Sequence, residues 1–235
     1  MSRIVFVTGA STGIGRACAQ AFAGVGDTVV IGHFDDEDAA QELAASLAGA
    51  CVRIDVRSDK SIKDAFSYIF DRFGRLDVLV NNAGVFRGGG MLSSQEDFDA
   101  CMHTNAYGVL SCAREYAFRS PQGVIISITS IRGHRNGVRQ GALVYAASKA
   151  AAESITRSLA QELHGRFTVN AVAPGPVDTA MQQQKSADER AEHIRGMHPQ
   201  EFIPPERVAQ AVVFLAQSPH ITGQSIIIDS GSTLP

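Results

Sequence analysis

Short apolar runs rich in β-branched residues alternate along the chain with longer segments in which apolar residues recur at helical spacing. The short runs predict seven strands, at residues 3–8, 28–33, 51–56, 76–84, 123–130, 167–175 and 224–229. The periodic segments predict helices at residues 14–23, 37–47, 59–73, 95–118, 145–163 and 205–217. This alternation is typical of a doubly wound α/β fold, with a seven-stranded, mainly parallel sheet and helices on both of its faces.

We expect residues 1–235 to form a single domain, because no repeat, low-complexity segment or second domain is visible. The polar stretch at residues 180–203 is the one long interruption, with a helical pattern near residues 187–195. A loop of this length inside a compact domain is commonly either a lid or disordered. We predict that this segment is a substrate lid.

The bulk composition excludes several classes of function. A formal net charge of −3 gives no basic excess for a nucleic acid or a membrane surface. No apolar run reaches transmembrane length, and the first residues do not resemble a signal peptide. The four cysteines lack CxxC or CxxH spacing, so we expect reduced thiols in a cytoplasmic protein without a metal site.

A glycine-rich turn follows the first predicted strand directly and opens the first helix. Its sequence is TGASTGIG (8–15), with Gly9, Gly13 and Gly15 at its bends. Missing side chains allow a pyrophosphate to approach the helix N-terminus, where free N–H groups and the dipole favour an anion. The turn, including Ser11, Thr12 and Ile14, therefore predicts a dinucleotide site of the Rossmann type, the alternative being a purely structural turn.

The end of the second predicted strand bears on the choice between NAD(H) and NADP(H). His33 occupies the position where an acid would bind the adenosine ribose, and Phe34 follows it. With no carboxylate and no arginine there, we favour NADP(H) slightly over NAD(H). Asp35, Asp36 and Glu37 complement the next helix N-terminus, although they could also reach the ribose. Asp55, followed by Val56, is a plausible acceptor for the adenine amino group.

Tyr145 and Lys149 stand four residues apart in YAASK (145–149), so on a helix they share one face. A free phenol has a pKa of about 10 and is a poor base at neutral pH, but a nearby cation favours its phenolate. Such a pair can exchange a proton with an alcohol or carbonyl oxygen while hydride moves to or from a nicotinamide. Taken alone, the spacing would equally suit a surface tyrosine under a lysine.

Six features in a fixed order remove that ambiguity. They are TGASTGIG, NNAG (81–84), TNAYG (104–108), Ser130, YAASK and PGPVDT (174–179). The set resembles the short-chain dehydrogenase/reductase family of the compact, single-domain type, over essentially the whole chain to ITGQSIIIDSG (221–231).

The resemblance implies a role for each matching residue. Tyr145 would be the catalytic acid/base, Lys149 its activating partner and ligand of the nicotinamide ribose, and Ser130 the hydroxyl that orients the carbonyl. Asn105 would continue the proton relay, unless it is simply a polar helix residue. The segments beside the cofactor and around its carboxamide would contribute Asn82, Ala83, Gly84, Pro174, Gly175, Val177 and Thr179. Ser127 and Thr129 are neighbours that could be confused with Ser130, which we prefer because it precedes the loop.

Two changes from the family pattern stand out: a serine in DSG (229–231), and a segment before Tyr145 that is about two residues longer than usual.

That longer segment carries Arg132, His134, Arg135 and Arg139. One hypothesis is that it binds an anionic carbonyl substrate, because arginine binds a carboxylate or phosphate with two hydrogen bonds. The alternatives are a solvated loop or a subunit contact.

We therefore expect an NAD(P)-dependent oxidoreductase that interconverts a secondary alcohol and a ketone or aldehyde. The alternative within this class is a 3-oxoacyl-carrier-protein reductase. A non-catalytic dinucleotide-binding sensor would not need the Tyr145–Lys149 pair, and a sugar-nucleotide epimerase or dehydratase usually carries an added domain. The expected partner is a small alcohol or carbonyl compound, and the family resemblance implies a homo-oligomer, a tetramer.

Overall fold

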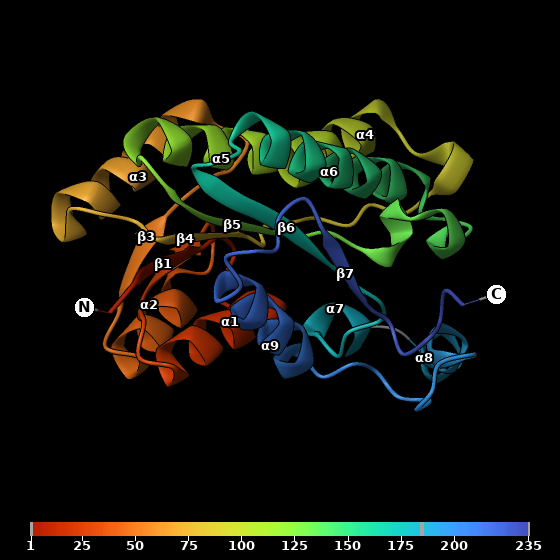
Figure 1. Cartoon of the computed structure of the whole chain (residues 1–235). Helices are drawn as coiled ribbons and strands as arrows, with labels where there is room; N and C mark the ends of the chain where they lie inside the picture. The colour runs from red at the N-terminus through yellow and green to blue at the C-terminus, as the bar shows by residue number, and fades with distance from the viewer. Residues whose placement is uncertain (1, 184–185, 235) are drawn as a thin grey trace.

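The computed structural model describes residues 2–183 and 186–234, and within them seven strands form one sheet (Figure 1). The strands are β1 (Ile4–Val7), β2 (Thr28–His33), β3 (Ala50–Arg53), β4 (Val78–Asn81), β5 (Gly123–Ile128), β6 (Phe167–Pro174) and β7 (Ser225–Ile228). They are hydrogen-bonded in the order β3-β2-β1-β4-β5-β6-β7, and each neighbouring pair is parallel. The expected doubly wound sheet is confirmed, and all its pairings are parallel.

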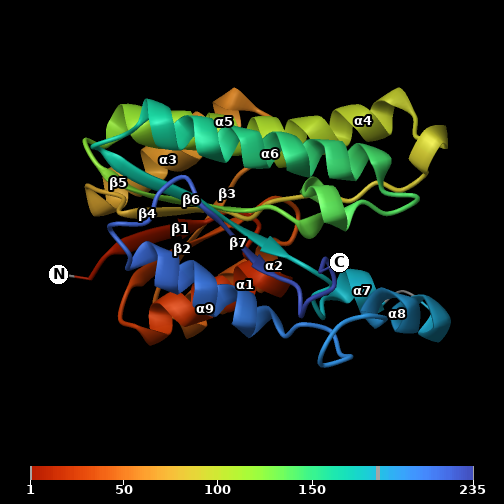
Figure 2. The same ribbon diagram turned by 45° about the vertical axis from the view of Figure 1, so that its right-hand side comes forward.

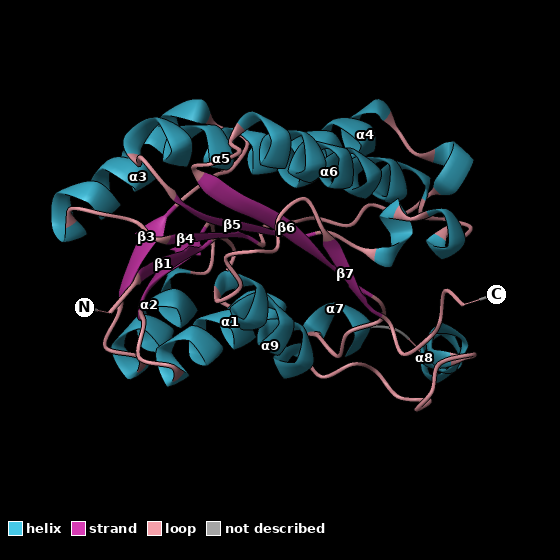
Figure 3. Ribbon diagram, in the orientation of Figure 1, coloured by secondary structure: helices cyan, strands magenta, loops and turns pink. Residues whose placement is uncertain are grey.

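The main helices form a layer on each face of the sheet, as Figures 1 and 3 show. One layer contains α3 (Asp59–Phe73), α4 (Gln95–Met102), α5 (Gly108–Arg119) and α6 (Leu143–Glu162). The other contains α1 (Gly13–Gly24), α2 (Glu37–Ser46) and α9 (Pro205–Ala216). The short helices α7 (Ala180–Gln183) and α8 (Ala187–Ile194) lie on the same side as α9 (Figure 2).

The alternation of side chains along each strand supplies both layers with a core. In β1, Val5 and Val7 belong to the cluster that includes residues of α1, α2 and α9. Ile4 and Phe6 belong to the cluster that includes residues of α3 and α5, where Phe6 meets the ring of Phe66 edge to face at 5.5 Å. Because both faces are buried, the strands read as continuous apolar runs rather than as alternating ones.

Three predicted strands end two or three residues earlier than expected. β3 ends at Arg53 rather than at residue 56, β4 ends at Asn81 rather than at residue 84, and β5 ends at Ile128 rather than at residue 130. The residues that follow are loop residues, which places their polar groups at the carboxyl edge of the sheet. The helix expected over residues 95–118 is interrupted by a π-helical turn at His103–Tyr107, between α4 and α5.

The strand order reverses direction at β1. The chain builds β2 and β3 on one side of β1, and then crosses to place β4 on the other side. In open α/β sheets, ligands bind at the carboxyl edge where the order reverses. The glycine turn after β1 and the NNAG segment after β4 lie on the two sides of this point.

Candidate active site

The glycine turn has the backbone conformation that a close-fitting anion site needs. Gly9 and Gly13 have φ angles of +62° and +55°, in the left-handed region that favours glycine. A Cβ on Gly9 would lie 2.9 Å from the Cα of Ala83, so the turn also packs directly on the segment after β4. Thr12 precedes α1 without capping it through its side chain. The first backbone N–H groups of α1 therefore receive no hydrogen bond acceptor from the Thr12 side chain, which suits a helix N-terminus that binds an anion.

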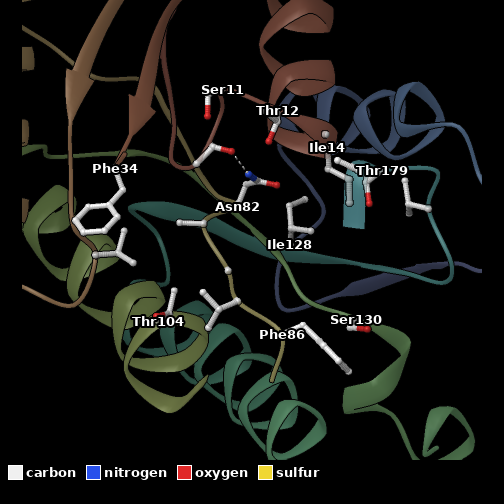
Figure 4. A pocket seen from close by; sticks show the side chains of 18 of the residues that line it. Ser11, Thr12, Ile14, Phe34, Asn82, Phe86, Thr104, Ile128, Ser130 and Thr179 are labelled. Atoms are coloured by element: carbon white, nitrogen blue, oxygen red, sulfur yellow. Dashed lines mark hydrogen bonds between the residues drawn. The ribbon is translucent and has the colours of Figure 1, made fainter. Parts of the chain in front are cut away.

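Asn82 ties the glycine turn to the segment after β4 (Figure 4). Its Nδ2 donates to the carbonyl oxygens of Thr8 at 2.9 Å and Gly9 at 2.8 Å. Thr8 Oγ1 in turn accepts the amide N–H groups of Asn82 and Ala83, both at 3.0 Å. The contacts join the two segments on either side of the reversal point into one rigid unit.

A cleft of about 680 Å³ runs along the carboxyl edge of the sheet. The predicted residues that line it are Gly9, Ser11, Thr12, Gly13, Ile14, Phe34, Asp55, Val56, Asn82, Ala83, Gly84, Ser130, Tyr145, Lys149, Pro174, Gly175, Val177 and Thr179. In Figure 4, Phe34 and Ser130 lie at opposite ends of it, with the glycine turn and Asn82 between them. The cleft therefore brings together the nucleotide end and the chemical end that the sequence predicts.

Three predicted residues lie behind the cleft rather than along it: Gly15, His33 and Asn105. A Cβ on Gly15 would lie 2.4 Å from the carbonyl oxygen of Gly9, so this glycine is needed for packing beneath the turn. His33 is only 3% exposed, and its Nδ1 has no hydrogen-bond partner among the residues that the structure describes. As the last residue of a central strand it points into the protein, which is why it does not reach the position expected of a ribose ligand.

The adenosine end of the cleft is built by residues that the sequence reading underweighted. Asp35, Asp36 and Arg57 line it beside Phe34 and Asp55. Arg57 donates to both carboxylate oxygens of Asp55 at 2.8 Å, and this hydrogen bonding is the main cause that lowers the pKa of Asp55. The guanidinium of Arg57 also lies 5.1 Å from the centre of the Phe34 ring. An arginine two residues after the predicted adenine acceptor was the available signal.

Tyr145 and Lys149 lie on one face of α6, as their spacing predicts. The ammonium of Lys149 is 5.9 Å from the centre of the Tyr145 ring, and it donates to the carbonyl oxygen of Ile128 at 2.8 Å. Phe86 packs against the phenol from the loop after β4, with ring centres 5.1 Å apart. Both residues line the cleft, so they are not simply a tyrosine and a lysine in contact on the protein surface.

The protein surroundings shift the pKa of both groups. Burial raises the pKa of the Tyr145 phenol, while a hydrogen bond with the Ser130 hydroxyl and the charge of Arg132 act in the other direction. Burial lowers the pKa of Lys149 to about 8, with Cys101 and Glu153 acting against it. At neutral pH the phenol of the free protein therefore carries its proton, and the lysine carries its charge.

A tight turn after β5 brings Ser130 to the phenol. A Cβ on Gly133 would lie 2.8 Å from the amide nitrogen of Ala150, so this turn rests directly on the backbone of α6 one turn beyond Tyr145. Ser127 and Thr129 do not compete for the role of Ser130. Ser127 is fully buried within β5, and Thr129 donates to the carboxylate of Glu153.

Asn105 occupies the π-helical turn and is fully buried. Its Nδ2 donates to the Val85 carbonyl oxygen at 2.8 Å and to Ser148 Oγ at 2.9 Å, and its Oδ1 accepts the Val85 amide N–H at 2.8 Å. π-helical turns are frequent at functional sites. The amide thus fastens the loop after β4 to α6, directly beneath the cleft.

Glu153 is not among the residues that line either cavity, but it holds together elements that carry the site, and sequence reading missed it. It lies one turn beyond Lys149 on α6 and is 3% exposed. Its carboxylate accepts from Ser225 Oγ at 2.9 Å and lies 3.2 Å from the Nε2 of His134, in addition to its bond with Thr129. The signal was a carboxylate at the next helical position after Tyr145 and Lys149, and its effect is to join α6 to β7 and to the loop after β5.

A second, smaller cavity adjoins the first at Tyr145 and Ser130. It measures about 370 Å³, and Arg132 and Arg139 are among its lining residues. Gln182 of α7 lines both cavities, so part of the segment predicted as a lid borders the cleft; residues 184–185 of that segment lie outside the described residues.

The described residues contain neither a cluster of metal ligands nor a membrane-spanning helix. Across residues 2–183 and 186–234 no three His, Cys, Asp or Glu side chains are grouped so that they could hold a metal ion. Over the same residues, no helix combines the length and apolar character needed to cross a membrane.

Comparisons with known proteins place the chain among oxidoreductases. The profile of a family described as enoyl-(acyl carrier protein) reductase matches residues 9–233. The chain is 35% identical over 240 residues to a protein of Thermotoga maritima named 3-oxoacyl-(acyl-carrier-protein) reductase FabG, with 97% of each chain covered. It is 39% identical over 241 residues to carbonyl reductase family member 4 of Danio rerio, covering 100% of this chain and 99% of that one.

A solved structure gives the same result for the fold. The crystal structure of a dehydrogenase/reductase from Sinorhizobium meliloti 1021 superposes with a TM-score of 0.93 at 30% identity, over 99% of this chain and 96% of that chain. With the cleft and its Tyr145–Lys149 pair, these relationships show that the chain belongs to the short-chain dehydrogenase/reductase family of NAD(P)-dependent oxidoreductases, in its compact single-domain form.

Proposed function

We propose that the large cleft binds NADP(H), and that Tyr145 exchanges the proton as a secondary alcohol and a ketone or aldehyde are interconverted. The observation that carries this proposal is that Tyr145, Lys149 and Ser130 line the same cleft as the glycine turn. The nicotinamide, when bound, supplies or accepts the hydride.

Each side chain has a defined task in the reducing direction. Burial keeps the Tyr145 phenol protonated, so it is ready to donate that proton to the carbonyl oxygen. The charged Lys149 then stabilises the phenolate that remains. The Ser130 hydroxyl donates to the same carbonyl oxygen as negative charge develops on it.

Other residues hold this arrangement in place. The Nδ2 of Asn105 donates to the Val85 carbonyl oxygen and to Ser148 Oγ. These two bonds support a role for Asn105 in positioning the site, in addition to any role in a proton relay. Pro174 ends β6, and Gly175, Val177 and Thr179 follow it. All four line the cleft, as the family's carboxamide-binding segment would.

The fit of a dinucleotide rests on the glycine turn. Gly9 and Gly13 have no side chains to hinder a pyrophosphate that approaches α1, and the Thr12 side chain does not cap that helix. The turn would hold the pyrophosphate, Asp55 and Val56 would lie at the adenine, and Lys149 at the nicotinamide ribose.

The preference for NADP(H) rests on the charges around Phe34. The last residue of β2 is the buried His33 rather than a carboxylate that could bind the ribose, and Arg57 lines the cleft nearby. Asp35 and Asp36 act in the other direction, and Arg57 is already paired with Asp55. We expect Arg57→Gln to raise the Kd of NADPH about tenfold, because one hydrogen bond to a charged group contributes about 1.5 kcal/mol. An unchanged NADPH affinity, or an equal loss for NADH, would contradict this preference.

The test of the function as a whole is a steady-state assay. The protein is titrated with NADPH and NADH by fluorescence, and a panel of ketones and aldehydes is then reduced with the preferred cofactor. We expect turnover of at least one carbonyl with strong dependence on the cofactor. Binding of either cofactor without turnover of any carbonyl would instead favour the non-catalytic sensor.

A 3-oxoacyl-carrier-protein reductase is the second candidate, because several relatives of this chain carry that name, including the Thermotoga maritima protein. A short 3-oxoacyl thioester in the carbonyl panel distinguishes it from a reductase of free carbonyl compounds.

The remaining proposals concern the lid over the substrate, the oligomeric state and the location in the cell. We propose that residues 180–203 act as the substrate lid, which the lining of the smaller cavity by Gln182 of α7 and by α8 supports. A homo-oligomer, a tetramer by family resemblance, is supported by exposed apolar side chains such as Phe118 of α5 and Phe214 of α9, and light scattering tests it. A cytoplasmic location stays a prediction from the cysteine pattern.

A further inference from the structure

The smaller cavity beside Tyr145 has a positively charged wall. It includes Ser130 and Tyr145, the two groups that we expect to meet the carbonyl oxygen, and it includes Arg132 and Arg139 from the segment between β5 and α6. An arginine is charged at every physiological pH. Two cations therefore border the space next to the reacting atoms.

Arg132 is fixed there by the turn that carries Ser130. Its amide N–H donates to Ser130 Oγ at 3.2 Å, and its Nη1 donates to the Gly137 carbonyl oxygen at 2.6 Å. Burial, followed by the like charge of Arg139, lowers the pKa of Arg132. Both guanidinium groups therefore belong to residues of the same cavity wall, and their like charges repel each other.

These two cations have no acidic partner within the described part of the chain. Over residues 2–183 and 186–234, neither Arg132 nor Arg139 has a carboxylate oxygen within 4.0 Å. Both arginines are half-buried, and a charge that is partly removed from water is stabilised by a partner of opposite charge. An anion in the cavity would provide that partner and relieve the mutual repulsion.

The acid in the cavity wall belongs to a different element. Glu189 and His193 of α8 also line the cavity. Glu189 Oε2 accepts the amide N–H and the hydroxyl of Ser186, both at 2.9 Å, in a capping box at the start of α8. The two cations thus come from the same segment as Ser130, whereas the carboxylate of Glu189 comes from α8 and is bonded within that helix's capping box.

We propose that the substrate of this reductase is a short carbonyl compound that carries a carboxylate, which Arg139 and Arg132 bind while its carbonyl oxygen meets Ser130 and Tyr145. The proposal rests on the function proposed above and adds the substrate class. The planar fork of arginine matches a carboxylate with two parallel hydrogen bonds. A cavity of about 370 Å³ is at the small end for ligand sites, which suits a short compound better than a long acyl chain.

The test compares an acid with its uncharged ester. Acetoacetate and methyl acetoacetate share the same ketone, and kcat/KM is measured for each with the wild-type protein, Arg139→Gln and Arg135→Gln. Arg139 is the better target because Arg132 also holds the turn beside the phenol. Arg135 is an exposed arginine of the same segment that does not line the cavity, so it is the matched control.

We expect Arg139→Gln to lower kcat/KM for acetoacetate by about 10- to 100-fold, mainly through KM, since the lost contact is charge-assisted. The same change should leave methyl acetoacetate within about twofold, and Arg135→Gln should leave both substrates within about twofold of wild type. An equal effect on acid and ester, or none on either, would overturn the carboxylate site and leave the reductase intact.

Two further measurements distinguish a wrong substrate class from a wrong proposed function. If 2-oxopropylphosphonate depends on Arg139 more steeply than acetoacetate does, the site still binds an anion, but one of the phosphate type, and the carboxylate assignment is wrong. If no ketone of the panel, charged or uncharged, is reduced with either cofactor, the proposed function fails and the substrate class falls with it.

Discussion

Removing the ammonium of Lys149 should change how the stability of the protein depends on pH. Lys149 is 5% exposed, and burial lowers its pKa from 10.5 to about 8. Between these two values the unfolded chain holds the proton and the folded protein has released it. Unfolding then takes up a proton, so the contribution of this group to the free energy of unfolding rises with pH, and it is flat below about pH 8.

The size of the effect follows from the two pKa values. For one group that titrates at about 8 when folded and at 10.5 when unfolded, the linkage relation gives a gain of about 2 kcal/mol between pH 7 and pH 9.5. Lys149→Met lacks this gain. The change also removes the donor to the Ile128 carbonyl oxygen, but that cost applies at both pH values and cancels in the difference.

The assay is urea unfolding of the cofactor-free protein at pH 7.0 and pH 9.5, for the wild type, Lys149→Met and Lys63→Met. Lys63 is an exposed lysine of α3 and serves as the matched control. We expect wild type and Lys63→Met to show the same change with pH, and Lys149→Met to gain about 2 kcal/mol less. If all three proteins change alike, the burial argument for Lys149 is wrong.

Two packing predictions concern the glycine turn. Gly15→Ala should destabilise the protein by about 1–3 kcal/mol, because its Cβ would lie 2.4 Å from the carbonyl oxygen of Gly9 in the turn. Gly24→Ala is the control: its Cβ would meet no described atom within 4 Å, so thermal melts should show neutral or slightly higher stability. A Gly15→Ala protein that melts like Gly24→Ala would show that the turn is looser than described. Thr8→Val should cost about 1–3 kcal/mol in urea unfolding, since the N–H groups of Asn82 and Ala83 lose their acceptor, and no measurable loss would mean that other acceptors replace it.

The fold was largely predictable because its signals are local. Apolar runs bounded by glycine or by polar residues located all seven strands, and the glycine turn located the reversal point at β1. Strand ends were less accurate: NNAG reads as a continuation of β4, yet residues 82–84 leave the ladder to contact the glycine turn. Such a change of partner depends on tertiary contacts that periodicity does not encode.

Other features of the site depend on orientation, which a one-dimensional pattern does not give. His33 has the position of a ribose ligand in the sequence, but the pleat of β2 turns its side chain inward. The helical pattern over residues 95–118 conceals a π-helical turn, because the apolar spacing on both sides stays helical. Glu153 shows its importance only when β7 and the loop after β5 are seen to meet at its carboxylate.

The central claim is that the Tyr145 phenol gives the proton to the carbonyl oxygen in a cleft that binds the cofactor independently. The most direct measurement compares Tyr145→Phe with Tyr68→Phe, a tyrosine on the surface of α3, in NADPH titration and in single-turnover reduction of the best carbonyl of the panel. We predict that Tyr145→Phe keeps the NADPH Kd within about threefold but reduces turnover by about 10²- to 10⁴-fold, while Tyr68→Phe behaves as wild type. Turnover near the wild-type rate in Tyr145→Phe would contradict the account.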